Sequence, residues 1–200
     1  MSSVPHTPWL LFDYGEVLCL APSDDERRGL EELVATYPTS HALWDRYWLE
    51  RPAYDLGAVT TGEYWSRVLG TSLDSAHLDE LHDHDVAMWS HPNPQTLEFV
   101  SRAHDAGYRL ALLSNAPAPF GDAFDTMSWL EVFEPRVFSG RLGVAKPTPQ
   151  IFRECLDLMK ASASEVTFID DREENVRAAE VLGFSTLHFE DASQLSRLLD

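Results

Sequence analysis

The sequence predicts an α/β fold, with a three-layer, Rossmann-like parallel sheet as its core and a small all-helical cap inserted after the first strand. Two features lead to this prediction. Short apolar runs that end abruptly alternate with segments of helical periodicity, which is typical of a parallel sheet with helices on both faces. In contrast, the stretch from residue 23 to residue 89 is helical in pattern and contains no convincing strand.

Five short apolar or β-branched segments are expected to form the strands, namely 9–12, 109–113, 136–138, 166–169 and 185–189. The first, second and fourth have the clearest patterns, because each is an apolar run that stops at polar or turn-forming residues. Amphipathic segments predict core helices at 95–106, 149–159 and 173–182. The last of these helices is expected to stop at Gly183, since glycine commonly ends a helix.

The helical stretch divides the chain into a predicted core, residues 1–20 and 90–200, and a predicted cap, residues 21–89. Pro92 and Pro94 mark the return from the cap to the sheet. A chain of 200 residues is long enough to bury such a core without disulfide bonds. The chain is therefore expected to form one core domain of ordinary size with a small insertion.

Composition and charge restrict the classes of protein to which the chain can belong and the partners that it can bind. The chain has 44% hydrophobic and 24% charged residues, which is an ordinary globular composition. Its formal net charge of −18 argues against a nucleic-acid partner, because such binding depends on Lys and Arg that neutralise phosphates. Cys19 and Cys155 are far apart and show no metal-binding or redox spacing, which predicts two reduced thiols.

The N-terminal residues have no basic segment followed by an apolar one, and no apolar run is long enough to span a bilayer. We therefore expect a cytoplasmic protein without a membrane partner. The sequence predicts no particular oligomeric state.

Polar residues follow three of the predicted strands at the point where each strand ends. In open parallel sheets ligands bind at the carboxyl ends of the strands, so these residues are expected to meet at one edge. A lone Lys in the loop before the helix at 149–159 adds a cation. The candidate site residues are Asp13, Ser114, Asn115, Lys146, Asp170 and Asp171. They combine a possible nucleophile, neutral hydrogen-bond donors, one positive charge and a pair of acids suited to a hard metal.

Four segments of the sequence resemble the motifs of the haloacid dehalogenase-like hydrolases. Residues 12–18, Phe-Asp-Tyr-Gly-Glu-Val-Leu, look like the first motif, and residues 113–115, Leu-Ser-Asn, look like the second. Residues 146–152, which begin with Lys-Pro, look like the third motif, and residues 168–176 around the Asp-Asp pair look like the fourth. All four occur in the right order, and the predicted helical insertion matches the small cap of this family.

The resemblance implies a nucleophile and a metal site. Asp13 is expected to attack phosphorus and to form an aspartyl-phosphate intermediate. Mg²⁺ is expected between nucleophile and phosphate, where it would offset their mutual repulsion. Its implied ligands are Asp13, the backbone carbonyl of Gly15 and Asp171, with Asp170 either a further ligand or a support beside them.

The resemblance also implies roles for the remaining polar residues. Ser114 and Asn115 are expected to donate hydrogen bonds to the phosphoryl oxygens as charge develops. Lys146 would neutralise phosphate and nucleophile together. Asn175, one helical turn after the Asp pair, would support Lys146 or Asp171. The implied activity is Mg²⁺-dependent hydrolysis of a small phosphomonoester.

The sequence departs from the family pattern at Gly15. Most phosphatases of the family have a second Asp there, which transfers a proton to the leaving group, and such roles are worth about 10²–10⁴ in rate. Glu16, one residue further on, is the nearest substitute. A substrate with a good leaving group, such as a sugar 1-phosphate or an acyl phosphate, would also compensate. Some relatives with an Asp-x-Gly opening are sugar-1-phosphate phosphatases, so that class is the first expectation for the substrate.

Two alternatives stay open at this point. A metal-free dehalogenase would use the same fold, although the fourth motif of such enzymes lacks the paired acids found at Asp170 and Asp171. The second alternative is a catalytically impaired binding protein derived from a phosphatase. Gly15 is the only residue that suggests it.

Two further features of the cap are interpreted as structural. His82-Asp83-His84-Asp85 is expected to be a solvated helix surface rather than a metal cluster, because residues two apart on a helix point in different directions. Several aromatic residues are expected to form the core of the cap, with one or two of them contacting the leaving group: Trp44, Tyr47, Trp48, Tyr54, Tyr64 and Trp65.

Overall fold

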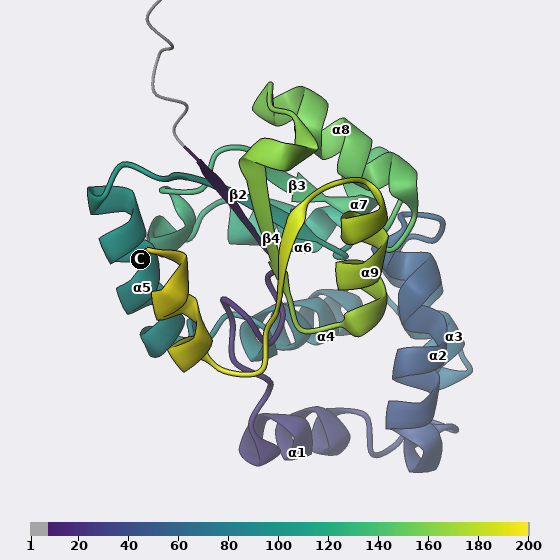
Figure 1. Ribbon diagram of the computed structural model, residues 1–200. Coiled ribbons are helices and arrows are strands. Elements are labelled where there is room, and N and C mark those ends of the chain that lie inside the picture. Colours follow the sequence, from purple (N-terminus) through teal and green to yellow (C-terminus); the bar gives the residue numbers. More distant parts are fainter. Residues whose placement is uncertain (1–7, 200) are drawn as a thin grey trace, which may run out of the picture.

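A computed structural model describes residues 8–199 and contains a parallel sheet of five strands in the order β3-β2-β1-β4-β5 (Figure 1). The strands are β1 (Trp9–Phe12), β2 (Arg109–Ser114), β3 (Arg136–Phe138), β4 (Val166–Asp170) and β5 (Ser185–His188). β1 lies at the centre, where Leu11 pairs with Ala111 on one side and with Phe168 on the other. The predicted α/β fold and all five predicted strands are confirmed.

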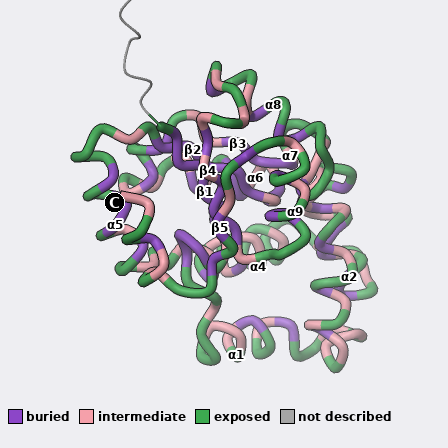
Figure 2. Tube along the Cα trace, in the orientation of Figure 1, coloured by how far each residue is buried: buried purple, intermediate pink, exposed green. Residues whose placement is uncertain are grey.

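Both faces of the sheet are buried at its centre, which explains why β1 is a continuous apolar run rather than an alternating one. Its side chains divide between two cores. Leu10 and Phe12 belong to one hydrophobic cluster, whereas Trp9 and Leu11 belong to the other. Figure 2 shows the consequence, a buried sheet surrounded by helices that expose their outer faces.

Three helices cover the sheet at the predicted places. α5 (Pro94–Asp105) contributes Phe99 to the first cluster, while α8 (Pro149–Met159) and α9 (Glu173–Val181) contribute to the second. α9 ends close to Gly183, whose φ of 93° is the left-handed value that favours glycine. The remaining core elements are the helices α6 (Ala118–Phe124) and α7 (Ser139–Leu142) and the short 3₁₀ turns η2 (Ser128–Leu130), η3 (Ala163–Glu165) and η4 (Ala192–Leu198).

The segment between β1 and β2 is helical, as predicted. It holds α1 (Asp24–Leu33), η1 (Ser40–Ala42), α2 (Leu43–Asp55), α3 (Thr61–Leu69) and α4 (Ser75–Met88) before α5 begins. Ser23 and Thr60 start α1 and α3 with reciprocal side-chain caps. We call this segment the helical insertion. The division into a core of residues 1–20 and 90–200 and a cap of residues 21–89 stays a prediction, and its positions 1–7 and 200 lie outside the described residues.

The C-terminal end of α2 is fastened to the core beside the end of β2. The Ser139 hydroxyl donates a hydrogen bond to the backbone oxygen of Asp55 and accepts one from the backbone N–H of Ala116. Just after α2, a Cβ at Gly57 would lie 2.6 Å from the backbone oxygen of Gly140, and the φ of Gly57 is 76°. This close approach holds one end of the helical insertion against the carboxyl edge of the sheet.

Within residues 8–199 no helix is both long and apolar enough to cross a membrane. Cys19 and Cys155 are buried and free of disulfide bonds, in agreement with the two thiols that were expected.

Candidate active site

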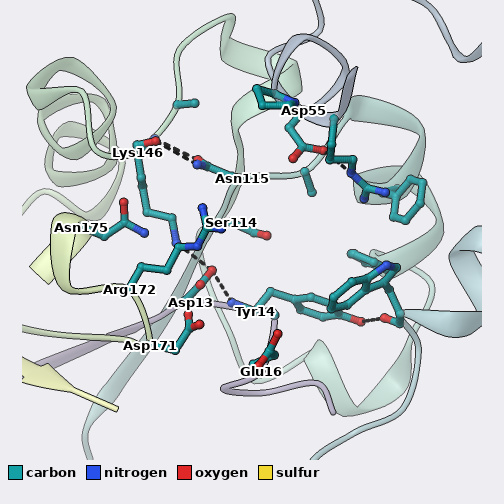
Figure 3. A pocket seen from close by; sticks show the side chains of 18 of the residues that line it. Asp13, Tyr14, Glu16, Asp55, Ser114, Asn115, Lys146, Asp171, Arg172 and Asn175 are labelled. Atoms are coloured by element: carbon teal, nitrogen blue, oxygen red, sulfur yellow. Dashed lines mark hydrogen bonds and ion pairs between the residues drawn. The ribbon is translucent and has the colours of Figure 1, made fainter. Parts of the chain in front are cut away.

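The strands place the predicted polar residues together. Asp13 directly follows β1, Ser114 ends β2 and Asp170 ends β4, and these three strands are neighbours in the sheet. A cavity of about 470 Å³ lies over their carboxyl ends (Figure 3). All the predicted site residues line this cavity except Asp170, which lies beneath it and is fully buried.

Lys146 lies between two carboxylates and bridges them. Its Nζ is 2.7 Å from Oδ1 of Asp13 and 2.7 Å from Oδ2 of Asp170, and only 1% of its side chain is exposed. Burial alone would lower the pKa of Lys146, but the charges of Asp13 and Asp170 outweigh it and raise the pKa above its usual value. Lys146 therefore stays protonated and supplies the positive charge of the site.

Asp13 has one carboxylate oxygen held and one free. Oδ1 accepts hydrogen bonds from Lys146 Nζ and from the backbone N–H of Tyr14, the latter at 2.7 Å. Oδ2 has no partner among residues 8–199. Burial raises the pKa of Asp13 to about 7, against the opposing attraction of Lys146. The geometry leaves Oδ2 available as a nucleophile.

Asp170 and Asn175 form the support beneath Lys146. Asp170 accepts hydrogen bonds from the Nδ2 of Asn175, at 2.9 Å and 3.1 Å, and from the backbone N–H of Arg172 at 2.8 Å. Asn175 was expected to support Lys146 or Asp171. It contacts Asp170 instead, and so it acts on Lys146 through that carboxylate.

Asn115 and Ser114 differ in whether their side chains already make hydrogen bonds within the protein. The Asn115 side chain donates to the backbone oxygen of Lys146 at 2.9 Å and accepts from its backbone N–H at 2.8 Å. Its amide therefore holds the Lys146 loop in place. Asn115 also lines the cavity, and its expected hydrogen bond to phosphate stays a prediction. The Ser114 hydroxyl lines the cavity and has no side-chain partner in the described part of the chain, so it is free to donate to a ligand.

Three carboxylates could hold a metal ion. Oxygen atoms of Asp13, Asp170 and Asp171 all lie within 4.8 Å of one another. Burial and the charge of Asp170 raise the pKa of Asp171, because the three acids face only one lysine. An oxygen-only donor set with excess negative charge fits a hard divalent cation such as Mg²⁺.

Gly15 and Glu16 lie at the rim of this metal-binding cluster. A Cβ at Gly15 would be 3.7 Å from the Trp89 ring, so the chain has room, but no carboxylate, at this position. Glu16 is exposed, has a φ of 57° and lines the same cavity. Its charge contributes to the raised pKa of Asp171, which places its carboxylate within electrostatic reach of the cluster.

Sequence reasoning missed two charged residues on the opposite side of the cavity, Arg51 and Asp55 of α2. Arg51 Nε is 2.7 Å from Asp55 Oδ1, and Nη1 is 3.4 Å from Asp85 Oδ2. The expectation that Asp85 lies on a solvated helix surface is wrong, because it is fully buried and accepts a hydrogen bond from Tyr47. The only local signal was the four-residue spacing of Arg51 and Asp55.

Among the aromatic residues that were singled out, only Trp48 lines the cavity. Tyr47, Tyr54, Tyr64 and Trp65 are buried in the core of the helical insertion, as expected. The other aromatic residues of the cavity are Tyr14, Trp89, Phe120 and Phe124.

Replacing Asp55 with Asn is expected to change how stability depends on pH. Burial raises the pKa of Asp55 from 3.8 to about 6, although Arg51 opposes this. The folded state therefore binds the proton more tightly than the unfolded state, and the contribution of Asp55 to stability falls as the pH rises through this range. Between about pH 4 and pH 7 the free energy of unfolding of Asp55→Asn should gain on the order of 2 kcal/mol relative to wild type.

Urea unfolding of both proteins at the two pH values measures this difference. Asp45→Asn, the same change at an exposed position of α2, serves as the control and should show no such gain. A difference for Asp55→Asn that does not vary with pH would contradict the raised pKa.

A carboxylate, a buried lysine and an acidic cluster at the strand ends of an α/β sheet are features of a class of hydrolases. The family model for haloacid dehalogenase-like hydrolases matches residues 11–183. The chain therefore belongs to the haloacid dehalogenase-like hydrolases and is an enzyme of that hydrolase family.

Curated relatives match parts of the chain. Bifunctional epoxide hydrolase 2 of Rattus norvegicus is 26% identical over 141 residues, which are 68% of this chain and 25% of that protein. Sesquiterpene phosphatase of Aspergillus oryzae is 28% identical over 50% of this chain and 52% of its own length. Phosphoglycolate phosphatase of Aliivibrio fischeri is 27% identical over 54% of this chain and 48% of its own length. The chain thus spans between a quarter and about half of the length of these relatives.

Solved structures share the fold over nearly the whole chain. A family enzyme from Bacteroides thetaiotaomicron, in complex with magnesium and inorganic phosphate, has a TM-score of 0.73 and 21% identity, and the match covers 94% of this chain and 98% of that one. L-2-haloacid dehalogenase from Xanthobacter autotrophicus has a TM-score of 0.64 and 17% identity, and the match covers 90% of this chain and 76% of that one. At these identities the likeness concerns the fold alone.

Proposed function

We propose that this protein is a Mg²⁺-dependent phosphomonoester hydrolase that acts on a small phosphorylated metabolite, with Asp13 as the nucleophile. The arrangement of Asp13 carries the proposal. Its Oδ1 is held by Lys146 and by the backbone of Tyr14, while Oδ2 is free beside an acidic cluster suited to a divalent cation. A carboxylate oriented in this way is a competent nucleophile toward phosphorus.

The reaction would proceed in two displacements. Asp13 Oδ2 forms a bond to phosphorus while the bond from phosphorus to the leaving oxygen breaks, which gives an aspartyl-phosphate and an alcohol once the leaving oxygen takes up a proton. Water then attacks phosphorus, releases inorganic phosphate and restores the Asp13 carboxylate. Lys146 offsets the negative charge on nucleophile and phosphate, and the Ser114 hydroxyl donates to a phosphoryl oxygen.

Asp13, Asp171 and the carbonyl of Gly15 are the proposed Mg²⁺ ligands. Asp170 is best understood as their support, because both its oxygens already accept hydrogen bonds. When bound, Mg²⁺ would supply charge that reduces the repulsion between phosphate and carboxylate.

Proton transfer to the leaving group has two proposed solutions, because Gly15 supplies no carboxylate. Glu16 lines the cavity and could act as the acid. Alternatively, a sugar 1-phosphate would leave with little assistance. Both solutions keep Asp13 as nucleophile and differ only in how the leaving oxygen is protonated.

The relatives and the acidic cluster favour a phosphatase over the two alternatives. Two of the curated relatives are phosphatases by name, and a similar fold has been solved with magnesium and inorganic phosphate. A metal-free dehalogenase has no need of the paired acids Asp170 and Asp171. Against a purely binding role stands the free Oδ2 of Asp13, which a binding protein would not require.

Removing Mg²⁺ is expected to abolish activity. Phosphate release from p-nitrophenyl phosphate and from a panel of sugar phosphates should fall to the enzyme-free rate in excess EDTA and return when Mg²⁺ is restored, because the acidic cluster then repels the phosphate. Halide release from 2-chloropropionate that persists in EDTA would instead identify a dehalogenase. Mg²⁺ binding without turnover of any ester would indicate a binding protein.

A further inference from the structure

We propose that the Arg51–Asp55 pair of α2 binds hydroxyl groups of the leaving group, so that the enzyme prefers phosphate esters of polyhydroxylated compounds over those of apolar alcohols. This proposal rests on the phosphomonoesterase function proposed above. It adds the class of alcohol and the residues that recognise it.

The pair lies where the leaving group must extend. Figure 3 shows Asp55 across the cavity from Asp13 and Asp171. A phosphoryl group bound at Asp13 and Ser114 occupies the floor of the cavity, so the rest of the ester points toward the helical insertion. Arg51 and Asp55 both line the cavity on that side.

Asp55 keeps one unused carboxylate oxygen beside the Arg51 guanidinium. Asp55 uses Oδ1 to accept from Arg51 Nε, while Arg51 uses Nη1 toward Tyr47 and Asp85. Asp55 Oδ2 accepts no hydrogen bond from the chain between residue 8 and residue 199. A free carboxylate oxygen beside a guanidinium group is complementary to a hydroxyl group, which both donates and accepts.

The pair is held rigidly before any ligand binds. Only 9% of the Arg51 side chain and 16% of the Asp55 side chain are exposed. The Arg51 guanidinium also lies over the Phe120 ring, with Cζ 4.7 Å from the ring centre. Nearly buried charged groups in fixed positions are costly to leave without hydrogen bonds once water is displaced. An apolar leaving group would displace that water without replacing its hydrogen bonds.

The local charge favours a neutral leaving group over an anionic one. Arg51 faces two carboxylates, Asp55 and Asp85, so this side of the cavity carries an excess of negative charge. Arg172 adds a cation at the cavity, but its side chain is 63% exposed and lies 3.7 Å from Glu174. A second phosphate or carboxylate on the substrate would therefore be repelled, whereas the hydroxyl groups of a sugar would not.

The test compares two esters of similar ring size, glucose 1-phosphate and cyclohexyl phosphate, in wild type and in Asp55→Asn. The substitution keeps the shape of the side chain but replaces the free acceptor with a donor. We expect wild type to prefer glucose 1-phosphate, and Asp55→Asn to lower the ratio of the two kcat/KM values about tenfold, mainly through the KM for glucose 1-phosphate. Asp45→Asn, the exposed change on the same helix, should leave the ratio as in wild type.

The outcomes separate the two proposals. If both esters are hydrolysed but the ratio is the same in wild type and Asp55→Asn, the role of the pair is wrong and the phosphatase stands. The role is equally wrong if wild type prefers cyclohexyl phosphate, and this outcome does not depend on the folding of any variant. If neither ester nor p-nitrophenyl phosphate is hydrolysed with Mg²⁺ present, the phosphatase proposal itself fails.

Discussion

Replacing Asp13 with Asn is expected to lower kcat for phosphate release by about 10⁴-fold or more, because the nucleophile is lost and no other carboxylate can take its position. Asp170 is fully buried with both oxygens engaged, and its Oδ2 already accepts from Lys146 at 2.7 Å. The amide of Asn has nearly the same shape as the carboxylate and can still accept from Lys146. The variant should therefore fold and bind phosphate without turning it over.

Steady-state phosphate release with Mg²⁺ present measures the loss, and thermal unfolding verifies that the variant is folded. Asp45→Asn, an identical chemical change at an exposed position, should retain the wild-type rate. An Asp13→Asn protein that kept more than about a tenth of the wild-type kcat would exclude covalent catalysis by Asp13.

Replacing Lys146 with Met is expected to reduce both activity and stability. Lys146 is the cation that both Asp13 and Asp170 contact at 2.7 Å, and its side chain is 1% exposed. Its removal leaves two buried carboxylates without their counter-charge, which should cost about 3–5 kcal/mol in the free energy of unfolding. It also removes a charge that stabilises the developing phosphoryl charge, which should lower kcat by about 10²–10³-fold.

The chain offers a matched control, because its only other lysine, Lys160, is exposed. Lys160→Met should leave kcat at the wild-type value. It should change the free energy of unfolding by about 0.5 kcal/mol at most. Urea unfolding near pH 7.5 compares the three proteins. If Lys146→Met were as stable as Lys160→Met, Lys146 would not be the counter-charge of the two carboxylates.

The acidic character of the chain and its proposed phosphate site are compatible because the positive charge is local. A formal net charge of −18 describes the whole molecule. At the site, one lysine is buried among carboxylates that raise its pKa and keep it protonated. The same carboxylates then provide the oxygen ligands for a divalent cation, so the negative charge serves the site rather than opposing it.

The local pattern was sufficient to locate much of the site. Asp13, Ser114 and Asp170 follow or end strands that are neighbours in the sheet, and the carboxyl ends of parallel strands necessarily meet at one edge. Strand position therefore determined which side chains would meet. It did not determine the contacts, because no pattern in the sequence indicates that the Asn115 amide also binds the backbone of Lys146.

The sequence by itself determined the parallel sheet, the helical insertion and the residues at the strand ends, because these depend on periodicity and on the order of elements along the chain. Only the tertiary structure decided that Arg51 and Asp55 line the cavity and that Asp85 is buried. Arg51 and Asp85 are 34 positions apart and meet only when α2 and α4 pack together. Pairing between distant elements depends on how they pack, and no local pattern of residues encodes that.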